Sequence, residues 1–272
     1  MKTALINALR LFATRWPRAG FWLAHALAWL SRPLGRGIAE ERLAAVFPEL
    51  GPAALRAARR GTWSTFLKAE ALDAALERPG ARPVYPEVAT NPALAELRAP
   101  LIVASFHVGA SSAVGAALEQ LPGEVLVLHR GRFAPRRDVT LVRVGEDEWE
   151  RARTLHRAVK TLRSGGFVFV AVDAYEQGYD VSTIEVPMFG GVVSLARGAF
   201  ALARITGAPI VPLAARWRGA RVEITCGEAI PPEPDDHATA AATARWLEGY
   251  LREFPGEISL RTLEILRLPP SR

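Results

Sequence analysis

Cysteine is nearly absent from this sequence, since Cys226 is the only one among 272 residues. One cysteine cannot close an intramolecular disulfide or form a CxxC pair, which excludes a disulfide-stabilised scaffold and a cysteine-rich zinc or redox site. The sequence also has no P-loop and no GxGxxG motif after a strand, and its histidines lack metal-ligand spacing. We therefore expect no metal and no cofactor.

Acidic residues are missing from the first 39 positions, which carry six basic residues: Lys2, Arg10, Arg15, Arg18, Arg32 and Arg36. The longest uncharged run in this segment, AGFWLAHALAWLS, has 13 residues, whereas a membrane-spanning helix needs about 20. Tryptophan and arginine side chains suit an anionic membrane interface, where the rings anchor and the arginines reach the headgroups. We predict that residues 1–31 form a helical segment lying on such a surface.

Two alternatives for this segment stay open. One is a helix packed on the core of the protein itself. The other is a cleaved signal peptide, which fits less well because the preceding basic stretch is long and Arg32-Pro33 follows the apolar run where small residues would be needed.

Helical periodicity continues from Glu40 to Leu76, with a break at Gly51-Pro52 where a second helix begins. The helical pattern is ended by Pro79, Gly80, Pro83 and Pro86. We assign residues 1–80 to an N-terminal helical, membrane-associating region and residues 81–272 to a core that forms one folded unit.

Strands and helices alternate beyond residue 100. The expected strands are the apolar runs LIVASF, VLVLH, TLVRV, FVFVAV, IVPLAA and RVEIT. Helices are expected over about 147–163 and 236–254, and Ser194 is expected to cap a further helix that ends at Gly207. This alternation predicts an α/β fold with a mixed, mainly parallel central sheet flanked by helices.

The stretch Leu101 to Ser112, LIVASFHVGASS, ends a buried strand in a histidine, His107. Ligands of open α/β sheets bind outside the carboxyl ends of the strands, so this histidine is a candidate general base. The alternative is a histidine with a purely structural or surface role.

Five blocks, in this order and spacing, resemble the lipid A biosynthesis lauroyl/myristoyl acyltransferase family of the lysophospholipid acyltransferase-like superfamily. They are RLAAVFPELGPAALRAARRGTWSTF, the strand ending in Phe106-His107, FVFVAVD, VPMFGG with SLARGAFALARITGAPIVPL, and RVEITCGEAIPP. The resemblance implies transfer of a fatty acyl chain from acyl carrier protein or coenzyme A to a lipid acceptor at the cytoplasmic face of the inner membrane. It implies no cofactor besides the acyl thioester donor.

The sequence departs from the signature of that family, a histidine followed after four residues by Asp or Glu. The corresponding position holds Ser112. The acid of such a pair fixes the tautomer of the imidazole and stabilises the imidazolium that forms during reaction. A serine carries no charge, so another carboxylate would have to replace the missing acid.

Two carboxylates are candidates for that replacement. Asp173 ends the FVFVAV strand and matches an acidic position of the family, and Glu176 follows shortly after it. If the strands that end in His107 and Asp173 are neighbours, both side chains open into one crevice. The alternatives are a strand-end turn or cap for Asp173 and a solvated loop charge for Glu176.

The resemblance also implies substrate-binding residues. Arg130 matches a position near the acceptor site, Phe189, Gly190 and Gly191 match a substrate-channel loop, and Arg197 on the following helix is a further candidate for an anion. Solvated arginines and an ordinary tight turn are the structural alternatives. Three neighbours of Arg130 are further basic candidates: Arg132, Arg136 and Arg137.

A net charge of +6 favours an anionic partner, here membrane lipid or an acidic carrier protein rather than nucleic acid. A serine hydrolase is disfavoured because GASSA lacks the spacing of a GxSxG elbow. Two hypotheses remain: an acyltransferase with His107 as its base, and a catalytically weakened or inactive relative that binds lipid or acyl carrier protein. Acyl length, donor carrier, acceptor and oligomeric state stay open.

Overall fold

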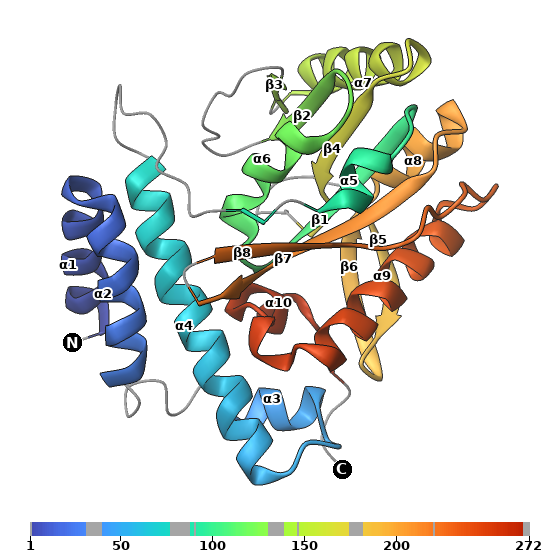
Figure 1. Ribbon diagram of the computed structural model, residues 1–272. Helices are drawn as coiled ribbons and strands as arrows, with labels where there is room; N and C mark the ends of the chain where they lie inside the picture. The colour runs from blue at the N-terminus through green and yellow to red at the C-terminus, as the bar shows by residue number, and fades with distance from the viewer. Residues whose placement is uncertain are drawn as a thin grey trace.

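The computed structural model describes residues 2–30, 40–76, 88–89, 91–129, 139–145, 147–173, 182–219 and 221–268. Its centre is a six-stranded sheet with the strand order β3-β2-β4-β1-β7-β8 (Figure 1). The strands are β1 (Leu101–Gly109), β2 (Val125–His129), β3 (Val139–Arg143), β4 (Phe167–Ala171), β7 (Ile210–Arg218) and β8 (Arg221–Cys226). All neighbouring pairs are parallel except β7 and β8, so the predicted mixed, mainly parallel sheet is confirmed.

The apolar strands are buried on both faces because helices cover both sides of the sheet (Figure 1). Along β1, Ile102 and Ala104 pack on one side with α7 (Glu148–Arg163), α8 (Gly198–Thr206) and α9 (Asp236–Glu253). Leu101 and Val103 pack on the other side with α5 (Pro92–Glu96) and α6 (Val114–Ala117). Short elements complete this part: η1 (Ser111–Ala113), η2 (Leu118–Gln120), η3 (Pro255–Glu257) and α10 (Leu260–Ile265).

A two-stranded antiparallel hairpin, β5 (Thr183–Met188) and β6 (Gly191–Ala196), lies beside α9 (Figure 1). The expected helix cap at Ser194 is wrong, because Ser194 lies within β6 and α8 begins only at Gly198. The predicted end of that helix is confirmed, since Gly207 has a φ of 74° and occupies the left-handed C-cap position.

The N-terminal region consists of α1 (Lys2–Arg15) and α2 (Pro17–Leu30), which pack on α4 (Pro52–Leu76), while α3 (Glu40–Val46) precedes α4 (Figure 1). One face of the pair is buried: Leu9, Ala13 and Ala24 pack against Trp63 and Leu67 of α4. Packing on the protein itself therefore accounts for this face. The predicted helical segment is two helices, because Pro17 starts a new one.

Four large apolar residues of this region are exposed, namely Leu11, Trp16, Trp22 and Leu30. Within the described residues, none of the helices combines the length and the apolar character that crossing a membrane would require. The predicted boundary at residue 80 lies outside the described residues.

Candidate active site

The candidate site forms where β1 and β4 run side by side in parallel, with Ser105 opposite Ala171. Two residues beyond this pair, the same register brings His107 and Asp173 together, although 66 positions separate them in the sequence. Nδ1 of His107 lies 2.8 Å from Oδ1 of Asp173, and the backbone N–H of His107 donates to Oδ2 at 2.7 Å. Both carboxylate oxygens are thus engaged by one residue, which fixes the orientation of the carboxylate toward the imidazole.

A bulge in β1 positions His107. Ser105 is paired with Leu213 of β7 and Gly109 with Ala215, so four steps along β1 correspond to two along β7. Gly109 has a φ of 57°, and a Cβ atom there would collide with the carbonyl oxygen of Ala215. The bulge therefore depends on glycine, both for its backbone conformation and for its close approach to β7.

The two side chains differ in their exposure to solvent. The Asp173 side chain is 3% exposed, whereas the His107 side chain is 38% exposed. With Nδ1 directed at the buried carboxylate, Nε2 is the ring nitrogen left for an external molecule. This arrangement suits a base that receives a proton from a substrate while a buried acid holds its tautomer.

The electrostatics of the pair favour the imidazolium form. Burial by itself would lower the pKa of His107, but the charge and hydrogen bond of Asp173 outweigh burial and raise the pKa above its ordinary value of 6.5. Arg261 on α10 opposes the rise and Asp73 on α4 supports it. Sequence reasoning missed these two residues, since neither belongs to a motif and each reaches the site only through the packing of its helix.

Ser112, the position at which the resemblance leads us to expect an acid, lies half-buried in η1. Among the described residues, no hydrogen bond joins Ser111 or Ser112 to His107. The described part of the site therefore pairs a base with an acid and provides no serine nucleophile next to the base.

The predicted arginines and Glu176 are not part of the described pair of His107 and Asp173. Glu176 and Arg130, together with Arg132, Arg136 and Arg137, lie outside the described residues. Arg197 donates from Nε to Asp236 at 2.9 Å, and Asp236 also accepts from Arg204 at 2.7 Å. Anion binding by Arg197 stays a prediction.

The predicted substrate-channel loop is the turn between β5 and β6. Phe189 and Gly190 have φ values of 51° and 70°, as the central residues of a tight hairpin turn do. The N–H of Phe189 donates to Glu248 at 2.8 Å, and its ring packs edge-on against Phe47 with centroids 5.1 Å apart. Gly191 lies so close to Arg267 that a Cβ atom would collide with its carbonyl oxygen. These contacts describe internal packing, and a role in substrate binding stays a prediction.

No protein-family model matches the sequence, and no curated protein matches it either. One similar solved structure is the 1-acyl-sn-glycerophosphate (LPA) acyltransferase PlsC from Thermotoga maritima, with 16% identity, a TM-score of 0.39 and 97% of each chain covered. Similarity of this degree carries no argument about activity. The resemblance to the lipid A acyltransferase family stays a prediction.

Proposed function

We propose that this protein transfers an acyl chain from a thioester to a hydroxyl or amine of a lipid or glycolipid acceptor. The observation that supports the proposal is the pair formed by His107, which is partly exposed, and Asp173, which is buried, at the carboxyl ends of β1 and β4. Asp173 occupies the position toward Nδ1 that the acid of the family signature would otherwise fill.

The chemistry follows from this geometry. Asp173 accepts a hydrogen bond from Nδ1–H, so Nε2 of neutral His107 is free to remove the proton of the acceptor as the acceptor attacks the thioester carbonyl. The new bond to the acyl carbon forms, the carbon–sulfur bond breaks, and the imidazolium returns its proton to the departing thiolate. The Asp173 carboxylate stabilises the positive charge on the ring between the two transfers.

The substrate class rests on the sequence resemblance together with the N-terminal helices. The resemblance implies acyl carrier protein or coenzyme A as donor carrier and a lipid acceptor at the inner membrane. The exposed residues Leu11 and Trp16 are accompanied by the exposed Arg15 and Arg18 in a segment without acidic residues. We infer that this surface rests peripherally on anionic lipid.

Membrane association is tested with a matched pair of variants. Trp16, between α1 and α2, is 53% exposed, and Trp149, on α7, is 76% exposed. Trp16→Ala should weaken binding to vesicles containing an anionic phospholipid by roughly tenfold, because burying a half-exposed aromatic ring contributes about 1.5 kcal/mol to such binding. Trp149→Ala should leave it unchanged. Equal effects would contradict the inferred orientation.

Acyl transfer is tested by mixing the purified chain with acyl carrier protein or coenzyme A thioesters and total membrane lipids. Thiol release and a lipid that gains one acyl chain, identified by mass spectrometry, are expected from the wild type and not from His107→Ala. If both proteins release no thiol with any donor while binding lipid, the enzymatic proposal fails and the lipid-binding alternative replaces it.

A further inference from the structure

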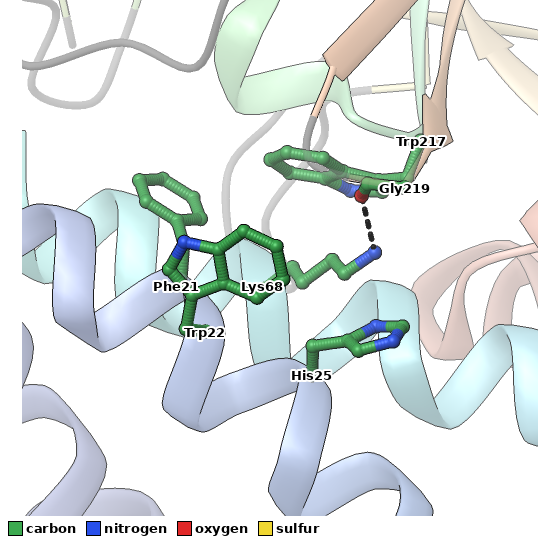
Figure 2. A pocket seen from close by; sticks show the side chains of 6 residues that line it. All are labelled: Phe21, Trp22, His25, Lys68, Trp217 and Gly219. Carbon is green, nitrogen blue, oxygen red and sulfur yellow. Dashed lines mark hydrogen bonds between the residues drawn. The ribbon is translucent and has the colours of Figure 1, made fainter.

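A cavity with a mostly apolar lining lies where α2 and α4 meet the end of β7. It has a volume of about 70 Å³ and is lined by Phe21, Trp22, His25, Lys68, Trp217 and Gly219 (Figure 2). About 10–15 Å³ of such space already holds a water molecule, so this cavity admits a group of several atoms. The carboxylate of Glu257 lies near Gly109 and acts electrostatically on Lys68.

Lys68 brings a buried ammonium group to this cavity. The residue is 6% exposed, and its Nζ donates to the carbonyl oxygen of Gly219 at 3.1 Å and lies 5.1 Å from the ring centroid of Trp217 (Figure 2). An ammonium has three N–H donors, and within the described residues only this one acceptor serves them. A buried cation with unfilled donors is costly, so the site favours an added acceptor of negative charge.

The indole of Trp217 adds a second unfilled donor. Its Nε1 is buried and has no hydrogen-bond partner among the described residues. An indole nitrogen can only donate. Lys68 and Trp217, which both line this cavity, therefore each have N–H groups without an acceptor among the described residues, and a cationic and a neutral donor together match an oxyanion.

The surroundings point to where such an anion would come from. Trp22, which lines the cavity, is 66% exposed on α2, and α2 belongs to the segment that has no acidic residue. Exposed tryptophan next to basic side chains is typical of surfaces that meet phospholipid headgroups. A soluble phosphate has the same chemistry and could reach the cavity directly.

We propose that this cavity binds a phosphate group, either on the headgroup of an anionic phospholipid or as a soluble phosphate, with Lys68 and Trp217 as its donors. The proposal requires neither acyl transfer nor a thioester, so it can be tested independently of the function of His107.

The test uses the full chain without an acyl donor and two probes. Inorganic phosphate is titrated by calorimetry, and phosphatidylcholine vesicles with and without phosphatidylglycerol are used in flotation. Lys68→Met should weaken binding of the effective probe at least tenfold, because hydrogen bonds to a charged group are lost. Trp217→Phe, which keeps the ring and the lysine charge, should weaken it about threefold to tenfold.

The control is Lys160→Met, which removes the same charge from an exposed position on α7 and should leave binding unchanged. Binding of phosphate itself would identify a soluble ligand, and binding only of phosphatidylglycerol vesicles would identify a headgroup site. His107→Ala should bind as the wild type does. The proposal is overturned if neither probe binds, or if Lys68→Met and folded Trp217→Phe behave like Lys160→Met.

Discussion

Replacing Asp173 with asparagine changes one atom of the candidate site, and the structure specifies the consequence. The backbone N–H of His107 donates to one carboxylate oxygen of Asp173 at 2.7 Å, so the amide oxygen of the variant must take that place. The amide NH₂ then faces Nδ1, which lies 2.8 Å from the other oxygen in the wild type. Nδ1 becomes an acceptor, the ring proton moves to Nε2, and the base loses the lone pair that it needs.

The expected loss in kcat/KM is large. A wrong tautomer at the corresponding position of a Ser-His-Asp triad lowers the rate by about 10⁴, and we expect Asp173→Asn to lower acyl transfer about 10³- to 10⁴-fold. The variant should fold normally, since the amide fills the same space and keeps the backbone hydrogen bond.

The pH dependence supplies a second readout. Asp173 raises the pKa of His107 above 6.5, so wild-type kcat/KM should fall as pH drops through that raised value and the base becomes protonated. In Asp173→Asn the residual activity should lose this limb or show it at lower pH. Initial rates of thiol release from pH 5.5 to 9 measure both effects. A folded variant with more than about a tenth of wild-type activity and an unchanged pH profile would refute the role of Asp173.

Three further substitutions have defined outcomes. Ser112→Glu should raise activity less than about threefold, because Asp173 already holds Nδ1 of His107; a much larger gain in thiol release would contradict this pairing. Burial raises the pKa of Glu257 from 4.5 to about 7, although the charge of Lys68 opposes this rise. Between these two values the folded chain retains a proton that the unfolded chain releases. The unfolding free energy should therefore fall as pH rises from about 4.5 to 7. In the wild type, the unfolding free energy measured in urea should be lower at pH 8 than at pH 5 by on the order of 1–3 kcal/mol, and Glu257→Gln should remove this difference. An equal difference in the wild type and in Glu257→Gln would contradict the role of Glu257. Gly61→Ala places a Cβ atom 2.6 Å from Cα of Gly256, so it should lower the unfolding free energy by about 1–3 kcal/mol, whereas Gly51→Ala, with open space around it, should not.

The centre of the sheet could be predicted because its inner strands, β2, β4, β1 and β7, are short and mostly apolar runs, as strands buried on both faces are. The hairpin of β5 and β6 escaped prediction, although the alternation along β5 is typical of a half-buried strand. The family resemblance assigns VPMFGG to a substrate-channel loop, and Arg197 alone separates the apolar residues of β6 from those of α8. The sequence pattern therefore places Ser194 at the start of the helix and not in a strand.

Only part of the candidate site could be predicted from the sequence. His107 and Asp173 each stand at the end of an apolar run, and their pairing required only that the two strands be neighbours, which they are. The bulge at 106–108 and the approach of Asp73 and Arg261 depend on how β7, α4 and α10 pack. No local pattern encodes such contacts, since they arise between segments far apart in the chain.

The central claim is that Asp173 holds His107 as a base with its proton on Nδ1, and nitrogen NMR of the imidazole rings tests it most directly. The chain has five histidines, and His107→Ala assigns the signal of interest. Above its raised pKa, His107 should show a protonated Nδ1 and an unprotonated Nε2, and Asp173→Asn should reverse the two. A His107 ring that carries its proton on Nε2 in the wild type, or exchanges freely between the two forms, would contradict the account.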